Sequence, residues 1–313
     1  MTEIFFQLLP FFALLGCGYA AVWTGLLSDE AIVNLTRFVF YFALSAMLFD
    51  FASDLPIDEI FDRQLVLAYT SASLLVYGLV TLIGRIRGCG IEESAIEAQC
   101  GVIGNIGFLG LPVLVLLFGE RAAAPVMLML SVDLMLFGSM VVAIISANRD
   151  GRLSPVVFWT ILKGLARNPM ILAIVFGLVW SILELPKPAP MAIFLDILGG
   201  AATPCALFAI GGSLVAKSAE RISVAGWLSF SKLVLHPLAV AVAGLWIFEV
   251  DRFLAAIMIA ASAMPVAGNI YILAQHYGVA PQRVSSSILF STVFSIATLT
   301  LVIGLVAGMA SMP

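Results

Sequence analysis

Two apolar segments of this chain carry helix-breaking residues at corresponding places in its two halves. Residues 104–112 read GNIGFLGLP and residues 264–269 read MPVAGN, and each stretch lies inside an apolar run. In lipid, a broken helix leaves backbone N–H and C=O groups without partners, which costs several kcal/mol for each group. Such breaks persist only where protein or a water-filled cavity surrounds them. Paired breaks in two halves are the best sequence indication of a transporter's binding site.

The composition places the chain in a membrane. The 313 residues are 62% hydrophobic and 11% charged, whereas soluble proteins contain about 25% charged residues. The net charge of −4 is too small and too dispersed to indicate a nucleic-acid partner. The four cysteines form no CxxC pair, and the chain has no nucleotide-binding loop, zinc motif or legible nucleophile–base pair. We therefore predict a membrane protein that is not an enzyme and has neither a metal centre nor a cofactor.

Charged and turn-rich segments divide the chain into ten apolar ranges, most of them of the roughly 20 residues that a crossing helix needs. The ranges are 4–25, 32–52, 64–84, 94–118, 122–147, 156–183, 190–216, 222–248, 253–277 and 284–310. After five crossings the chain is on the opposite side of the membrane, so the second half enters the bilayer from the other face. If the two halves, 1–150 and 151–313, share a fold, they must therefore be inverted repeats. The breaks then fall in the fourth range of each half, and we expect these two helices to cross near mid-bilayer. The predicted fold is all-α and polytopic, with ten transmembrane helices as two inverted five-helix repeats.

Lysine and arginine residues set the predicted orientation, because cytoplasmic loops carry an excess of them. The loops after the odd-numbered ranges hold Arg85, Arg87, Arg149, Arg152, Lys217, Arg221 and Arg283. The loops after the even-numbered ranges hold Arg63, Arg121, Lys187 and Arg252. We therefore expect the first set on the cytoplasmic side of the cytoplasmic (inner) membrane and both termini on the outer side.

The residues at the two breaks form the predicted substrate site. The N-terminal ends of half-helices carry partial positive charge and free N–H groups, which favour an anion. Asn105 and Asn269 add amides that both donate and accept hydrogen bonds. The predicted site comprises Gly104, Asn105, Gly107, Pro112, Pro265, Gly268 and Asn269. The alternative interpretation is that the two asparagines only satisfy the local backbone.

Three ionisable residues are candidates for ion coupling or counter-charge. Asp133 lies mid-way along 122–147, where an ionisable side chain costs about 2.5–3.5 kcal/mol on the insertion scale. It is either a carboxylate that binds a proton or Na⁺, or the structural partner of a basic group on another helix. Lys232 and His236 are four residues apart, so they share one helix face as counter-charge, partner of Asp133 or proton-transfer group. The alternative for Lys232 is that it reaches to the membrane interface. The range 64–84 holds no acidic or basic side chain, so we expect the coupling chemistry outside it.

The broken segments resemble the signatures of a known family. Residues 105–112, NIGFLGLP, and 264–271, MPVAGNIY, are similar to those of the auxin efflux carriers, which include bacterial permeases associated with malonate and the plant PIN-FORMED carriers. Similarity at 167–169, RNP, and 204–208, PCALF, extends the resemblance over essentially the whole chain. The resemblance implies crossing fourth and ninth helices, a scaffold of helices 1, 2, 6 and 7 that forms a homodimer, and a moving transport unit of helices 3–5 and 8–10. One departure is Ser45, where many members have proline.

These observations predict a secondary active transporter of a small organic anion, a malonate-like or auxin-like carboxylate, that works by alternating access. Its partners are the anion, the bilayer and a second copy of the chain, with H⁺ or Na⁺ as the coupling ion. A Na⁺ near the crossing has no assigned ligands. Two other functions stay open, a Na⁺/H⁺ exchanger of the same crossed-helix type and a membrane ligand sensor that does not transport. Flux measured with and without an organic anion separates them.

Overall fold

The computed structural model describes residues 2–54, 62–150, 159, 162–163, 165–215 and 222–310. Within these ranges the chain is helical, and the β-type pairing consists of one isolated bridge. The all-α prediction is therefore confirmed. Arg152, Lys217 and Arg221, which the orientation prediction uses, lie outside the described residues.

Six of the described helices are long and apolar enough to cross a membrane, and four shorter apolar helices accompany them. The long ones are Asp29–Asp54, Arg63–Ile86, Glu120–Arg149, Ala189–Val215, Ile222–Ile247 and Pro281–Met309. The shorter ones are Leu9–Trp23, Ile106–Phe118, Pro169–Ile182 and Arg252–Ser262. These helices support a polytopic membrane protein.

The first half of the chain runs from α1 to α9. Its helices and π- or 3₁₀-helical turns (η) are α1 (Thr2–Trp23), α2 (Asp29–Phe38), η1 (Val39–Ala43), α3 (Leu44–Asp54), α5 (Arg63–Ile86), α6 (Ile91–Val102), η2 (Ile106–Gly110), α7 (Leu111–Phe118), η3 (Glu120–Ala122), α8 (Ala123–Val132), η4 (Asp133–Phe137) and α9 (Gly138–Asp150). Several of these follow one another without a break, so α8, η4 and α9 form one long helix.

The described part of the second half runs from α11 to α18. Its elements are α11 (Pro169–Ile182), α12 (Ala189–Gly200), α13 (Ala202–Val215), α14 (Ile222–Phe230), η5 (Ser231–Leu235), α15 (His236–Val242), η6 (Ala243–Ile247), α16 (Arg252–Ser262), α17 (Asn269–Tyr277) and α18 (Pro281–Ala310). The π-helical turns η4 and η5 contain Asp133 and Lys232, and such turns are frequent at functional sites.

Polar side chains begin several of these helices. The capping residues are Ser28, Asp62, Asn168 and Asp251, and each accepts a hydrogen bond from a backbone N–H in the first turn. Such caps satisfy N–H groups that have no partner within the helix. The start of α11 shows how local sequence sets a helix end. Asn168 caps the helix, and Pro169 takes the first helical position, where no N–H is needed.

Ser45 replaces the expected proline without breaking its helix. The π-helical turn η1 ends two residues before it, and α2, η1 and α3 follow one another directly. The Ser45 hydroxyl donates to the carbonyl of Phe40 across 3.1 Å. A serine whose hydroxyl bonds back to the π-helical turn therefore occupies the position where many members of the resembled family have proline.

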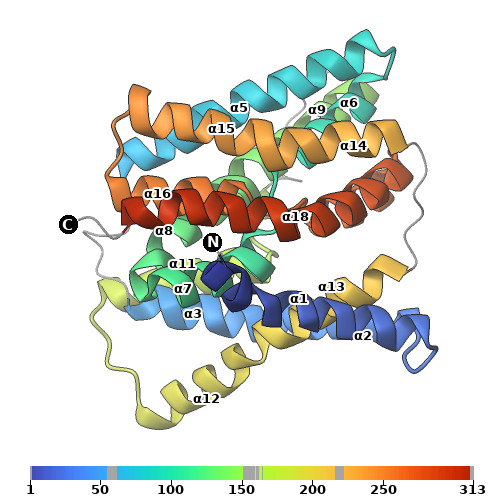
Figure 1. The fold of residues 1–313 in the computed structure, drawn as a ribbon. Coiled ribbons are helices and arrows are strands. Elements are labelled where there is room, and N and C mark those ends of the chain that lie inside the picture. Colours follow the sequence, from blue (N-terminus) through green and yellow to red (C-terminus); the bar gives the residue numbers. More distant parts are fainter. Residues whose placement is uncertain are drawn as a thin grey trace.

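The helices form two groups. Figure 1 shows α1, α2, α3, α12 and α13 in the lower part of the view and α5, α14, α15, α16 and α18 in the upper part. In the first group α1 packs on α13, and α3 packs on α11 and α12. In the second group α5 packs on α6 and α15, and α18 packs on α14 and α16. The broken segments therefore lie among helices that pack mainly on one another.

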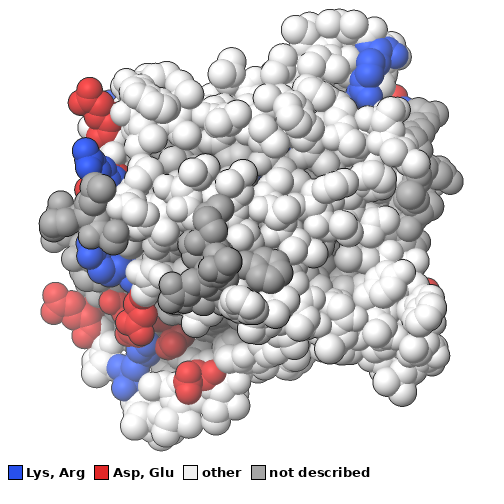
Figure 2. Space-filling model, viewed as in Figure 1, with Lys and Arg blue, Asp and Glu red and all other residues white. Residues whose placement is uncertain are grey.

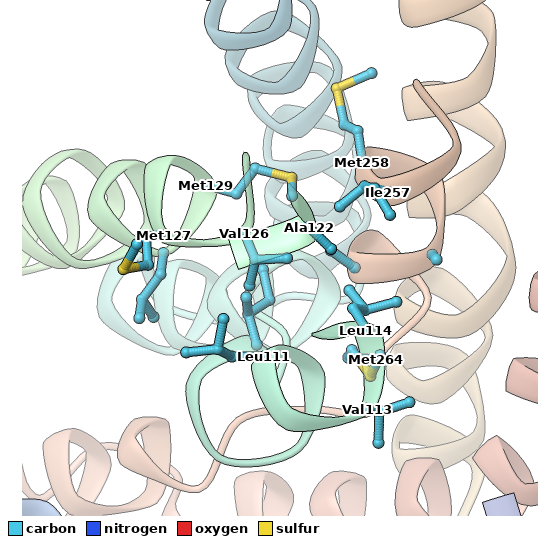
Figure 3. Packing of buried hydrophobic residues seen from close by; sticks show 14 of the residues in the cluster. Leu111, Val113, Leu114, Ala122, Val126, Met127, Met129, Ile257, Met258 and Met264 are labelled. Carbon is cyan, nitrogen blue, oxygen red and sulfur yellow. The ribbon is translucent and has the colours of Figure 1, made fainter. Parts of the chain in front are cut away.

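Close-packed side chains fill the space between α7, α8 and α16. Figure 3 shows Leu111 and Leu114 of α7, Val126 and Met129 of α8 and Ile257 of α16 in this cluster. Lipid tails are as apolar as these residues, so close packing, and not transfer out of lipid, holds such helices together. Methionine, which adapts to irregular gaps, supplies several members of the cluster.

Two glycines bring α1 and α13 into backbone contact. A Cβ atom built on Gly18 would lie 1.9 Å from the Phe208 carbonyl oxygen, and one built on Gly211 would lie 1.9 Å from the Leu15 carbonyl oxygen. Only glycine fits at such an approach, and small residues at helix interfaces are typical of membrane proteins. The α1–α13 pair is therefore tightly joined.

The surface is largely uncharged. Figure 2 shows Lys, Arg, Asp and Glu side chains at the left and right edges of the view, with a broad uncharged band between them. Large apolar side chains exposed on the protein include Leu75 and Trp246, which are 70% and 69% exposed. The helices in Figure 1 run across the same band, as expected of a protein surrounded by lipid.

Candidate functional site

The two breaks predicted from the sequence are present and lie against each other. Helix α6 ends at Val102 and α16 ends at Ser262. The two extended segments that follow pair through an antiparallel bridge between Gly104 and Val266. The Asn105 N–H donates to the Pro265 carbonyl at 2.8 Å, and the Ala267 N–H donates to the Ile103 carbonyl at 3.1 Å. Each break therefore satisfies backbone groups of the other.

Side chains from two further elements satisfy more of the freed backbone. The Val266 N–H donates to the Ser291 hydroxyl of α18 at 3.0 Å. The Ser262 carbonyl, at the last residue of α16, accepts a hydrogen bond from the Lys232 ammonium of η5. The C-terminal end of a helix carries a partial charge of about −0.5. A buried cation beside the Ser262 carbonyl offsets that charge.

The predicted substrate residues have different surroundings. Asn105 is buried at 7% exposure, whereas Gly268 and Asn269, at the start of α17, are exposed. A Cβ atom built on Gly104 would lie 3.1 Å from the Lys232 Nζ atom, so the ammonium lies directly beside the first break. The second break is therefore the accessible side of the paired segments.

The remaining predicted substrate residues lie close to the breaks. Gly107, in η2, packs near the Met170 methyl group, which would be 3.0 Å from an added Cβ atom. Pro112 is the second residue of α7, which follows the π-helical turn η2 without a gap. Pro265 contributes its carbonyl to the pairing of the two segments.

A buried polar cluster adjoins the breaks. The Tyr69 hydroxyl donates to Oδ1 of Asp133 at 2.8 Å, and the Asp133 Oδ2 atom is buried without a hydrogen-bond partner in the described part of the chain. The Ser73 hydroxyl lies 2.9 Å from Nε2 of His236, and the Lys232 Nζ atom lies 3.2 Å from Nδ1 of the same ring. All five side chains are at most 4% exposed. The cluster thus joins the first break to the long helix that contains Asp133.

Helix geometry explains how this cluster is assembled. Tyr69 and Ser73 lie four residues apart on α5, so one face of α5 contacts both Asp133 and His236. Lys232 and His236 are also four residues apart, and the contact between their side chains confirms the predicted shared face. The described ion pairs do not include Asp133 with Lys232. Asp133 therefore has Tyr69 as its hydrogen-bond partner, and not a basic group.

Ion pairs connect several helix ends at one edge of the same group. The Glu97 side chain, 1% exposed, pairs with Arg87 and Arg283. Arg149 pairs with Glu92 at 2.8 Å and also donates to a carbonyl at the end of α17. The hydrogen bond from Arg149 lowers the pKa of Glu92. These contacts tie the ends of α5, α6, α9, α17 and α18 to one another.

The comparisons with known proteins agree with this arrangement. The sequence matches the family described as "Membrane transport protein" over residues 3–303. The chain belongs to this family. The resemblance to the auxin efflux carriers is thereby confirmed, and so is the prediction of a transporter and not an enzyme.

Two relatives of this membrane transport protein match along nearly their whole length. The chain is 32% identical over 307 residues to the "Putative malonate transporter" of Rhizobium meliloti (strain 1021), which covers 96% of this chain and 95% of that protein. It is 24% identical over 314 residues to the "Uncharacterized transporter YfdV" of Escherichia coli (strain K12), with 95% and 96% covered. Both matches span the two breaks and the buried cluster.

Some residues of the buried cluster and of the paired breaks were not predicted. The sequence did not single out Tyr69 and Ser73, which lie in the range 64–84 and contact Asp133 and His236. Their i, i+4 spacing was the only available signal. Ser291 was missed as well, because it is one of several serines on α18 that resemble ordinary packing residues.

Proposed function

We propose that this chain is a secondary active transporter that moves a small carboxylate across the cytoplasmic (inner) membrane by alternating access, coupled to an ion gradient. The observation that carries the proposal is the pairing of Gly104 with Val266, with the Lys232 ammonium directly beside it. Paired breaks at mid-membrane are the usual substrate site of secondary transporters. Membership of the family and the name of the Rhizobium relative support transport of a carboxylate.

The chemistry of the paired breaks suits a carboxylate. The N–H groups at the start of α17 favour negative charge, and Gly268 and Asn269 are accessible there. Asn105 offers amide donors from the other break. Lys232, with its Nζ atom beside Gly104, supplies a positive charge in surroundings of low polarity, where electrostatic attraction is stronger than in water.

The proposed architecture is ten crossing helices in two inverted repeats, 1–150 and 151–313, with both termini outside. Helices α1–α3 and α11–α13 would form a scaffold that pairs in a homodimer, and α5–α9 with α14–α18 would form the moving unit. The backbone contact at Gly18 and Gly211 supports a rigid scaffold. The ion pairs of Glu97 and Arg149 support a moving unit whose helix ends travel together.

A Na⁺/H⁺ exchanger is the second candidate. The unpartnered Asp133 Oδ2 atom favours it, because such exchangers place an acidic side chain near the paired breaks. In that case Asp133 would bind cations alternately and no organic anion would move.

Counterflow in proteoliposomes distinguishes these functions. Vesicles with the purified protein are preloaded with acetate, pyruvate, malonate, succinate or indole-3-acetate, and uptake of the same labelled acid is measured. We expect counterflow of at least one acid, absent from protein-free vesicles. If none of the acids shows counterflow and a Na⁺ gradient drives proton movement, the protein is instead a Na⁺/H⁺ exchanger. A ligand sensor would show thermal stabilisation by an acid without either flux.

A further inference from the structure

A lysine stands at the end of α16 where a bound cation would otherwise be needed. In transporters with broken helices, carbonyls at the unwound ends commonly coordinate Na⁺. Here the Ser262 carbonyl accepts a hydrogen bond from Lys232, whose side chain is completely buried. A built-in ammonium therefore offsets the negative end of α16, and this position offers no room for a sodium ion that needs the same carbonyl.

The carboxyl group of Asp133, in the same buried cluster, has one oxygen without a described hydrogen-bond partner. Asp133 is 4% exposed, Tyr69 donates to its Oδ1 atom, and its Oδ2 atom has no partner within the described residues. A buried carboxylate that has no cation in direct contact is costly in surroundings of low polarity. A proton on Oδ2 removes that charge, so this oxygen is a natural point for reversible protonation.

The other titratable groups around the pair are already engaged. An ammonium can only donate, so Lys232 donates to Nδ1 of His236, and the Nε2–H of that ring then donates to the Ser73 hydroxyl. Tyr69 of α5 donates to Asp133. The helices α6 and α18, which also pack on η5, carry the charged residues Glu92, Glu93, Glu97 and Arg283, which are in ion pairs at the helix ends, and the buried thiol of Cys100. Among the described charged groups around this pair, Asp133 is thus the one with an oxygen free to take a proton.

We infer that the coupling ion is a proton carried by Asp133, that Lys232 makes Na⁺ unnecessary, and that one proton moves with each substrate molecule. The inference rests on the proposed carboxylate transport. When Asp133 is ionised, it offsets the charge of Lys232. When a proton from water forms an O–H bond at Oδ2, the lysine charge is left uncompensated beside Gly104 and attracts the carboxylate. Release on the other side breaks that O–H bond and returns the proton to water there.

The test uses the proteoliposomes and the five acids described above, in potassium buffers without Na⁺. An acidic exterior should drive accumulation of the transported acid in the wild-type protein, and adding Na⁺ should change nothing. A pH indicator inside the vesicles should record one proton entering for each molecule of acid taken up. Asp133→Asn should lose gradient-driven accumulation, and its residual counterflow should no longer vary with pH. Asp196→Asn is the matched control, because Asp196 is an exposed acid on α12, and it should behave as wild type.

The outcomes distinguish a failure of the proposed carboxylate transport from a failure of the inferred proton coupling. Counterflow by the wild type of none of the acids would overturn the proposed function itself. Net uptake that requires Na⁺, or that brings in no proton, would overturn only the present inference, and so would accumulation by a folded Asp133→Asn variant under a pH gradient. Size-exclusion and melting profiles establish whether that variant is folded. If the variant is not folded, the number of protons that enter with each acid molecule in the wild-type protein still tests the inference.

Discussion

The Asn105 N–H donates to the Pro265 carbonyl across 2.8 Å, so the two halves of the chain meet through their main chains. Proline at this position in the second break removes one donor, but its carbonyl still accepts. The pairing needs no particular side chain at these positions, only two extended segments of suitable length. Side chains from α18 and η5 then satisfy the backbone groups that remain.

Ser291→Ala tests whether these side-chain hydrogen bonds to the broken backbone contribute to stability. It should leave the Val266 N–H buried without its acceptor, which costs about 1–3 kcal/mol. Ser295→Ala is the matched control on the same helix, because the Ser295 hydroxyl is equally buried but bonds only to the Thr292 carbonyl one turn before it. Melting temperatures of the purified proteins measure the difference. Equal destabilisation by the two substitutions would show that the Val266 bond is unimportant.

Asn105→Ala and Asn269→Ala should both abolish counterflow of the transported acid, because each removes an amide from one of the paired breaks. Their effects on stability should differ. Asn105 is buried, so its loss should lower the melting temperature, whereas the exposed Asn269 should leave it within the range of a surface substitution, about 0.5 kcal/mol.

Asn34→Ala provides the control for these two variants, since Asn34 is an exposed asparagine on α2, far along the chain from both breaks. Wild-type counterflow by both Asn105→Ala and Asn269→Ala would remove the amides from the proposed site. A loss of insertion into the membrane would instead point to the alternative interpretation, in which they only support the backbone.

The sequence predicted where helices begin, end and break with good accuracy. The predicted range 253–277 matches the start of α16 at Arg252 and the end of α17 at Tyr277. The reason is that charged caps mark the helix ends, while glycine and proline mark the breaks, and both act locally. The meeting of the two breaks also followed from the sequence, through the parity of the predicted crossings.

The composition of the buried cluster was harder to predict. Tyr69 and Ser73 occur in an apolar helix, where tyrosine and serine are ordinary packing residues, and their role depends on which helix lies opposite. The same reason explains the contrast between Asn105 and Asn269, because exposure depends on what packs over each residue. Such differences arise from tertiary packing, and no local pattern encodes them.

Gly18→Ala tests the contact between α1 and α13. The added methyl group would meet the Phe208 carbonyl oxygen, part of the main chain, so the two helices must separate. We expect a loss of about 1–3 kcal/mol, as for other overpacked positions. Gly16→Ala on the same helix has open space around its Cβ atom and should be neutral or slightly stabilising. Thermal melting in detergent compares them, and indistinguishable melting of the two variants would contradict the close approach.

Glu97→Gln tests the ion pairs that join the helix ends. The Glu97 side chain is 1% exposed and lies between two arginines, so losing its charge should cost about 1.5–3 kcal/mol. Glu93→Gln is the control, because Glu93 is 41% exposed and lies 3.4 Å from Arg283. A pair of that kind contributes at most about 1 kcal/mol. If Glu93→Gln lowered the melting temperature as much as Glu97→Gln, burial would not be the source of the effect.

Lys187 should make stability depend on alkaline pH. Partial burial lowers the pKa of Lys187, but hydrogen bonds to Asp50 at 2.8 Å and Asp54 at 2.6 Å outweigh it, so the net pKa is raised above its ordinary value of 10.5. A raised pKa means that the folded protein holds the proton more tightly than the unfolded chain. The stabilisation is therefore fully present below 10.5 and is lost as the pH rises through the folded-state pKa.

Lys187→Met should accordingly melt at a lower temperature than wild type at neutral pH, by an amount equivalent to about 1 kcal/mol or less, since both carboxylates are partly exposed. The difference should stay constant through mildly alkaline pH and shrink once the pH exceeds the ordinary lysine value. Lys163→Met, which removes an exposed lysine, should show no such dependence. Melting curves recorded across alkaline pH measure both variants, and a difference for Lys187→Met that persists undiminished at the highest pH would mean that packing of the side chain, and not its charge, stabilises this end of α3.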